Sequence, residues 1–425
     1  MYTQISIFKL ASARRNLAVG LIALSLQTAV HSEPLTLNQA LNMAEANNPG
    51  LDRFRSQHLA SLERVELADA LPDPKLQVTY FGESVQTRTG PQEAIYSVSQ
   101  TLPWWGKLNR KADYAESEAS AAEDLYQSGR LQLRREVAYR YYELGYLAQS
   151  ILSTEANLKL LGNLAAITDE RVRGGESLNE LLRINLEVER KRDLLDGLTQ
   201  SRESGRAQLA ALLALPVESL PELAELTADS DTLPEREALQ LALEAKNPEL
   251  SALRRGIESA RYRSELARLE RYPDFTFGLN YIQVGSALAV TPDAGKDPWS
   301  VSLAVSLPIW GGKNSAARKE ASALRDASQA HYEERMLQLK ADLSVALAKF
   351  KEARVRIDRY DTKLIPLAEQ AMENTQSGYA NSMQTMTDLI DSERSLLEVQ
   401  LIYWRAVADL EKAKASIRAL IGANT

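Results

Sequence analysis

The chain has 425 residues, of which 44% are hydrophobic and 25% charged, and its formal net charge is -7 at pH 7. This acidic balance, without a basic stretch interleaved with aromatic residues, argues against nucleic-acid binding. The sequence has no cysteine and only three histidines, which excludes disulfides, thiolate metal sites, a cysteine nucleophile, an acylated N-terminal cysteine and a dense histidine metal site.

The first 32 residues have the pattern of a secretory signal peptide. Arg14 and Arg15 lie in a basic region, residues 17–26 form an apolar core too short to span a bilayer, and small residues permit cleavage after Ser32. A buried N-terminal helix is the alternative interpretation. No later segment reaches the roughly 20 apolar residues of a transmembrane helix, so an exported chain that enters a membrane would do so as strands.

Two helices are expected next. Thr36 and Gln39 fit a capping box ahead of a short helix. Asparagine followed by proline, as at Asn48-Pro49, suits an N-cap with proline at the first helical position. A second helix should therefore begin there and run to about Ala70.

Apolar and polar residues then alternate in two segments, at about 75–82 and 94–102. Each has the length of a tilted strand that crosses a bilayer with an apolar outside and a polar inside. Two hairpins on a soluble core would also alternate. Aromatic residues near the strand ends and small polar residues on the opposite face favour membrane strands, with the loop at about 83–93 outside the cell.

The junction Pro103–Lys107, with the sequence Pro-Trp-Trp-Gly-Lys, opens a helical hairpin at about 107–213 that turns at 173–177. Its first arm would be roughly 100 Å long at ~1.5 Å per residue, a length typical of a coiled-coil tube. Basic residues at its start, Lys107, Arg110 and Lys111, either contact lipid phosphates or form a solvated helix start. Residues 215–235, rich in proline and acidic residues, are expected to form a linker outside the tube or to be disordered.

The same series then repeats, which indicates an internal duplication. The first copy spans 33–214 and the second 236–425. The elements of the second copy are helices around Asn247-Pro248, strands at about 274–282 and 299–307, an exterior loop at about 284–298, the junction Pro308–Lys313, and a helical hairpin at about 313–420 that turns at 377–382.

Four strands cannot close a barrel, and an open sheet edge is not tolerated in lipid. Copies of the chain must therefore associate. A trimer with twelve strands is the smallest cyclic solution with a useful lumen, although the pattern alone leaves other numbers open.

Taken in this order and twice over, the Asn-Pro steps, strand pairs, Pro-x-Trp-Gly junctions and Gly/Ser turns resemble the outer-membrane efflux (TolC) family along the whole mature chain. The resemblance implies a mostly α homotrimer in a Gram-negative outer membrane. Its 12-stranded β-barrel, four strands per chain, would continue into a long α-helical coiled-coil tunnel in the periplasm. The implied partners are outer-membrane lipid, a periplasmic adaptor (membrane fusion) protein and a proton-driven inner-membrane pump.

The resemblance also places a periplasmic gate and the adaptor contacts at the two hairpin turns. The family's Asp-x-x-Asp pair matches Asp388 and Asp391, and Glu180 occupies the corresponding place in the first copy. Threefold symmetry would turn such carboxylates into acidic rings, which select cations in pores; a solvated acidic helix start is the alternative. Where the family usually has glycine, the second turn has Ser382. The expected adaptor contacts are Gly174, Gly175, Ser177, Asn381, Ser382 and Thr385.

The function expected from these features is that of a passive exit duct. The Pro-Trp-Trp-Gly-Lys junction is closer to the heavy-metal branch of the family than to the multidrug branch, and multidrug efflux and type I protein secretion are the alternatives. A periplasmic coiled-coil adaptor would also contain long hairpins, but it would carry a lipoyl-like β-domain and no such strand pairs. No nucleophile elbow, phosphate loop, HExxH motif or acid/base cluster is present, so we expect neither an enzyme nor a cofactor.

Overall fold

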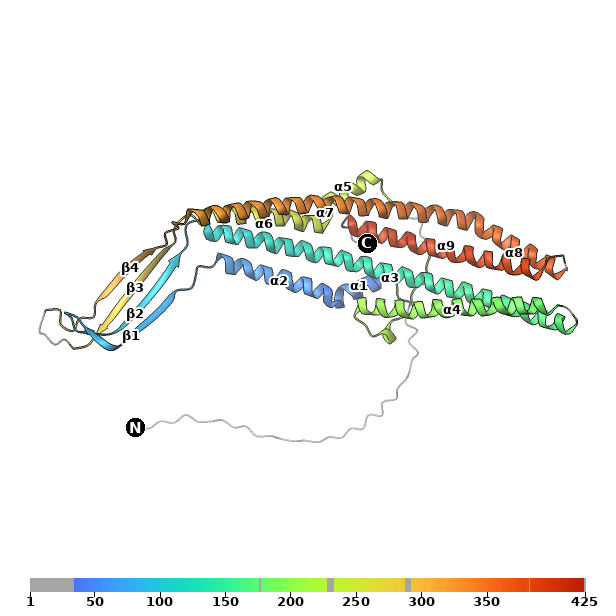
Figure 1. Cartoon of the computed structure of the whole chain (residues 1–425), viewed down its shortest axis with the longest axis horizontal. Helices are drawn as coiled ribbons and strands as arrows, with labels where there is room; N and C mark the ends of the chain where they lie inside the picture. The colour runs from blue at the N-terminus through green and yellow to red at the C-terminus, as the bar shows by residue number, and fades with distance from the viewer. Residues whose placement is uncertain (1–33, 176, 228–232, 287–291, 382, 424–425) are drawn as a thin grey trace, which may run out of the picture.

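The structure, a computed structural model, has the four strands of its described residues at one end and the turns of two helical hairpins at the other (Figure 1). The structure describes residues 34–175, 177–227, 233–286, 292–381 and 383–423. The signal peptide expected at 1–32 lies outside these ranges.

The two halves of the chain contain the same series of elements. The first half has helices α1 (Leu37–Asn47) and α2 (Pro49–Asp69), strands β1 (Lys75–Gln86) and β2 (Pro91–Leu102), and helices α3 (Lys107–Arg173) and α4 (Leu178–Leu213). The second half has α5 (Arg236–Lys246), α6 (Pro248–Leu269), β3 (Phe275–Val284), β4 (Trp299–Val305), α7 (Gly311–Arg359), α8 (Ile365–Ala380) and α9 (Met386–Leu420).

Strands β1 and β2 extend into the segment expected to be a loop. The connection is a short turn in which the Thr87 backbone N–H donates to the Gly90 carbonyl at 3.0 Å. A shift of register between Tyr80 and Val85 interrupts the ladder. The backbone pairing of β1 and β2 therefore continues beyond the residues that alternate in polarity. An irregular ladder can pair without such alternation.

The strands form one antiparallel sheet in the order β1-β2-β3-β4. Paired residues share a face of the sheet, so the register shows what each face carries. One row across the sheet is Leu76, Val98, Leu279 and Val301, and the next row, on the other face, is Gln77, Ser97, Asn280 and Ser300. The apolar residues of the first row are exposed. One face is thus apolar and the other polar across all four strands.

The two asparagines of the Asn-Pro steps join helix ends. The side-chain oxygen of Asn48 caps α2, and that of Asn247 caps α6. Their amide nitrogens also donate to carbonyls in the last turns of the hairpins, Asn48 to Leu212 and Asn247 to Leu420, each at 2.9 Å. Each short helix is therefore bound to the end of the hairpin in its own half.

The first junction makes a buried contact between the two halves. The Lys107 ammonium lies 2.8 Å from Asp274 Oδ1 and donates to the Tyr272 carbonyl at 3.0 Å. Trp104 stacks on Tyr272 with 4.9 Å between ring centroids, and Arg110 pairs with acidic neighbours on α3 and α6. Lys107 thus belongs to the packing between the halves and is not a solvated start of a helix.

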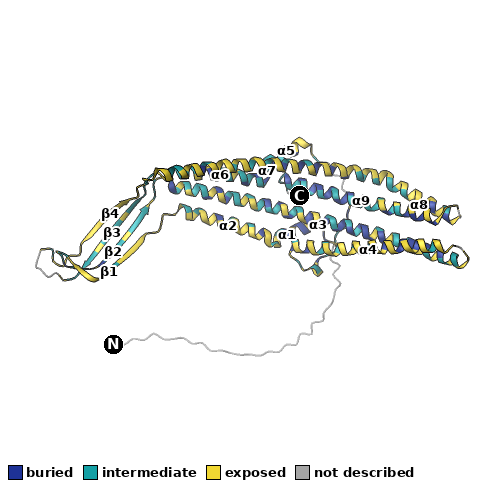
Figure 2. Cartoon of the chain, viewed as in Figure 1, coloured by how far each residue is buried: buried dark blue, intermediate teal, exposed yellow. Residues whose placement is uncertain are grey.

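Buried residues gather along the helical body, whereas the edge strands β1 and β4 are largely exposed and the inner strands β2 and β3 are mostly of intermediate exposure (Figure 2). One apolar cluster lies in each half around the short helices. A third, nearer the hairpin turns, combines residues of α3, α4, α8 and α9 and so joins the halves. None of the described helices contains a segment both long and apolar enough to cross a membrane.

One further segment packs against the helical body, and another interrupts an expected helix. The described part of 215–235 packs against the helical body: Leu220 and Leu226 are buried, and Leu223 pairs with Leu35. In the second hairpin a π-helical turn, Tyr360–Leu364, separates α7 from α8. Pro366 follows this turn. Because proline has no backbone N–H, it cannot donate the regular α-helical hydrogen bond to the carbonyl four residues before it.

Candidate gate at the hairpin turns

The two hairpin turns lie at the same end of the molecule, remote from the sheet (Figure 1). Side chains connect them directly. The Tyr379 hydroxyl of α8 donates to Glu180 Oε2 of α4 at 3.3 Å, and Arg183 of α4 donates to Thr387 of α9 at 2.9 Å. The turns of both repeats therefore form one end surface within a single chain.

The first turn depends on its glycines. Gly175 has a φ of 105°, in the left-handed region that favours glycine, and the Gly174 N–H closes α3 on the Glu170 carbonyl at 3.1 Å. Ser177 caps α4 by accepting from the Asn179 N–H at 3.3 Å. These three residues, expected as adaptor contacts, thus define the shape of the turn.

The second turn is held by Thr385 and Asp388. Each side chain accepts a hydrogen bond from the backbone N–H of the other residue, which completes a capping box at the start of α9. Asn381 closes α8 by donating to the Ser377 carbonyl at 2.9 Å. Helix α9 thus begins at Met386 and not directly after the turn expected at 377–382, because the cap fixes its start. Ser382 lies outside the described residues.

Glu180 and Asp388 occupy the same third position of their helices but have different partners. Asp388 caps its own helix, and the N–H and hydroxyl of Thr385 hold its pKa below the usual value. Glu180 reaches to Tyr379 on the other hairpin. Asp391 is exposed, 3.6 Å from Arg394. The structure brings the three expected gate residues to one end of the molecule, but in the described part of the chain they do not share a hydrogen-bond network.

The sequence interpretation missed a charged network that lies one to two helical turns further from the end. Glu187 of α4 is buried, and it accepts a hydrogen bond from Arg394 of α9 and lies 3.5 Å from Lys191 of its own helix. Although burial opposes ionisation, these cations hold the pKa of Glu187 below its usual value. The network links α4 to α9 beside the third apolar cluster.

Glu393, next to this network, was also missed. Its side chain is fully buried, and neither carboxylate oxygen has a hydrogen-bond partner among the described residues. Burial raises its pKa to about 7. The sequence does contain a signal, because Glu393 stands at a core position of the helical stripe formed by Leu389 and Leu397.

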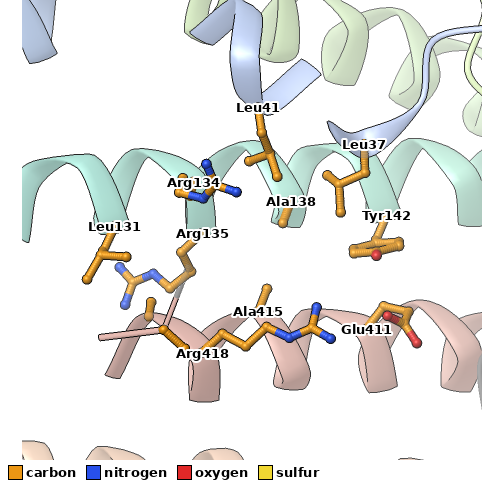
Figure 3. Close-up of a pocket in the computed structure, with 12 residues that line it drawn as sticks. Leu37, Leu41, Leu131, Arg134, Arg135, Ala138, Tyr142, Glu411, Ala415 and Arg418 are labelled. Carbon is orange, nitrogen blue, oxygen red and sulfur yellow. The ribbon is translucent and has the colours of Figure 1, made fainter. Parts of the chain in front are cut away.

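A separate pocket lies near the middle of the helical body, where α1 and α3 of the first half meet α9 of the second (Figure 3). Arg135 and Arg418 extend into the space between the helices. Burial and a hydrogen bond to Glu411 raise the pKa of Tyr142 there. These residues were not expected as a site, and they join the halves at a distance from the hairpin turns.

The comparisons with known proteins agree with this geometry. The family model described as "Outer membrane efflux protein" matches residues 40–215 and 238–423, one match in each half. The chain belongs to the outer membrane efflux protein family. Proteins of this family are trimeric outer-membrane channels, not enzymes, with a helical tunnel in the periplasm and with adaptor and inner-membrane pump partners. The expected fold class and location are confirmed.

Two curated relatives of this efflux protein have named roles. The cobalt-zinc-cadmium resistance protein CzcC of Cupriavidus metallidurans is 22% identical over 398 residues, covering 92% of this chain and 90% of the relative. The pyoverdine export outer membrane protein OpmQ of Pseudomonas putida is 24% identical over 313 residues, covering 72% and 65%.

Solved structures show the same fold for this efflux protein. VceC of Vibrio cholerae has a TM-score of 0.76 at 21% identity and covers 91% of this chain and 96% of its own. The outer-membrane channel OprN has a TM-score of 0.80 at 18% identity, with coverage of 91% and 90%. CusC has a TM-score of 0.79 at 16% identity, with coverage of 91% and 92%.

Proposed function

We propose that this efflux protein is the outer-membrane exit duct of a metal-cation efflux system, fed by a periplasmic adaptor and a proton-driven inner-membrane pump. The observation that carries the choice of cargo is the match to CzcC, a protein named for cobalt, zinc and cadmium resistance, over 92% of the chain. The match to OpmQ is shorter. The duct itself is passive, and the pump supplies the energy.

In this proposal the hairpin turns form the periplasmic entrance. The exposed Asp391 and the cap residue Asp388 lie at the start of α9, and Glu180 lies beside them on α4. In a trimer, three copies of each carboxylate would surround the axis, and acidic rings attract cations and repel anions. The adaptor would contact the turns themselves, at Gly174, Gly175, Ser177, Asn381, Ser382 and Thr385.

A second candidate cargo is a siderophore, favoured by the similarity to OpmQ. Growth of a deletion strain distinguishes the two. We expect the deletion strain to be sensitive to cobalt, zinc and cadmium salts and to keep its tolerance of dyes and antibiotics. The wild-type gene should restore the metal tolerance. Loss of siderophore export or drug tolerance with normal metal tolerance would reject the metal cargo while leaving the duct intact.

The acidic entrance is tested by Asp391→Asn, which removes a charge but no helix cap. Because multivalent cations would bind less tightly to a weakened ring, we expect block of the single-channel current by Co²⁺ to need roughly 3- to 10-fold more ion, about 0.7–1.4 kcal/mol. Planar-bilayer recordings measure this. Glu398→Gln, an exposed charge on the same helix, should leave the block unchanged. Equal block in all three proteins would place Asp391 away from the constriction.

A further inference from the structure

Glu393 lies at a buried position of α9 where the neighbouring residues on the same face are apolar. On α9, Leu389 and Ile390 stand four and three positions before Glu393, and Leu397 stands four positions after it; all three are buried. Residues at this spacing share one face of a helix. The glutamate therefore lies within the apolar stripe along which α9 packs against its neighbours, and its side chain is 0% exposed.

The charges around Glu393 are already paired with another group. The charged groups that act on it are Lys191 and Glu187 of α4 and Arg394 of its own helix. Arg394 donates to Glu187, and Lys191 lies 3.5 Å from Glu187. Glu187 thus takes both cations, which leaves the two oxygens of Glu393 without a hydrogen bond in the described structure.

The other elements around this part of α9 offer mainly apolar surface. In the same cluster α3 contributes Leu161 and Leu164, and α8 contributes Met372 and Tyr379. Tyr379 is the titratable member, and its hydroxyl donates to Glu180. A buried carboxylate without a partner is strongly destabilising, whereas its protonated form is tolerated much better.

We propose that Glu393 is a proton-binding site that controls the packing of the two helical hairpins against each other near their turns. With a proton bound, the side chain is neutral and the packing seen here is stable. When the proton leaves, the buried charge favours separation of α9 from α4 and α3, which exposes the carboxylate to water.

The direction of the pH dependence follows from linkage. Burial raises the pKa of Glu393 to about 7, whereas a solvated glutamate has a pKa of about 4.3. The packed arrangement is therefore fully favoured below the lower value and loses its advantage as the pH rises to about 7. Over this window the equilibrium constant for separation should rise by up to about tenfold per pH unit, and it should be constant above it.

Hydrogen exchange on the purified full-length protein tests the site. The readout is the local opening of amides in residues 386–400 between pH 5 and pH 8, corrected for the intrinsic chemical exchange rate. We expect the wild-type opening constant to rise more than tenfold over this range. Glu393→Gln, which keeps the shape and cannot ionise, should remove this rise, and Glu398→Gln should retain it because Glu398 is exposed on the same helix.

Two outcomes would overturn the proposal: a Glu393→Gln protein with the wild-type pH profile, or a wild-type protein whose opening does not change with pH. If the glutamine variant does not assemble, Glu393→Leu provides the same comparison, since leucine suits the apolar stripe. The exchange measurement requires neither cargo nor pump, although its consequence for channel opening rests on the proposed function. Failure of the metal-growth test would therefore leave the proton site untouched, and failure here would leave the cargo untouched.

Discussion

At the two Asn-Pro steps a single side chain makes two kinds of contact. The side-chain oxygen caps the helix that follows, and the amide nitrogen binds the carbonyl of a residue more than 160 positions later, Leu212 for Asn48 and Leu420 for Asn247. The asparagine amide carries its acceptor oxygen and its donor nitrogen on separate atoms of one short, neutral side chain, so both contacts can form at once. The step is therefore a tertiary contact as well as a helix start.

Asn247→Ala should lower the free energy of unfolding by about 2–4 kcal/mol, because it removes a cap and leaves a buried carbonyl unpaired. Asn48→Ala should cost less, since its hydrogen bonds are partly exposed to water whereas those of Asn247 are buried. Denaturant unfolding followed by circular dichroism measures both. An equal loss in the two variants would show that burial does not set the difference.

Sequence reasoning reached some residue roles and missed others for identifiable reasons. The caps at Thr36, Asn48 and Asn247 were predictable because capping depends on local sequence. The acidic pair was predicted as a unit, yet Asp388 serves its own helix while Asp391 faces solvent, a division that side-chain geometry decides. The state of Glu393 depends on Glu187, about 200 residues away, which no local pattern reveals.

At the level of elements, the two junction motifs are alike in sequence but different in role. Lys107 is buried against Asp274, at the start of the second strand pair. The equivalent Lys313 is exposed, as are Ile309 and Trp310 beside it. The two halves therefore contain similar elements, but their junctions differ. The first junction forms a contact between the halves, whereas the residues named at the second are exposed.

Lys107→Met should destabilise the folded chain by about 1–3 kcal/mol, because among the described residues the Asp274 carboxylate would keep one hydrogen-bond donor, the Trp104 N–H. The partial exposure of Asp274 keeps the loss below that of a fully buried pair. Lys313→Met is the matched control and should be nearly neutral. Thermal unfolding of Lys107→Met, Asp274→Asn and the double variant measures the coupling between the two residues. Losses of stability that add up in the double variant would contradict a direct contact.

The long hairpins were predictable as elements, whereas their interruptions were not. Periodicity over many turns identifies a helix reliably, and the first hairpin begins at Lys107 as expected. In the second hairpin Pro366 was overlooked as a breaker, and the π-helical turn before it divides the arm into α7 and α8. The start of α9 was misplaced because the Thr385 capping box was not recognised.

For the whole molecule, the sheet explains why one chain is not a complete channel. Its edge strands are β1 and β4, and one of its faces is apolar. The alternation of residues predicted the two faces, and the impossibility of an open edge in lipid predicted association. The cargo was not predictable in the same way, because a passive duct need not bind what it passes.

The free edge of β4 provides the test of assembly. The Ser306 N–H donates to the Asp274 carbonyl, and the Ile282 N–H donates to the Pro298 carbonyl, so even-numbered residues of β4 pair with β3. Backbone groups alternate between the two sides of a strand. The N–H of Leu303 therefore points to the free edge, where a neighbouring copy would pair.

Leu303→Pro should abolish the trimer while each chain keeps its helices and its β3–β4 pairing, because proline removes one donor from the edge alone. Leu303→Ala retains the N–H and should assemble normally, whereas Ser302→Pro should disrupt the pairing of β4 with β3 within the chain. Unboiled gel mobility and light scattering of the purified proteins measure assembly, and circular dichroism measures helix content. Leu303→Pro trimers as stable as those of Leu303→Ala would mean that copies associate through the helices without pairing at this edge.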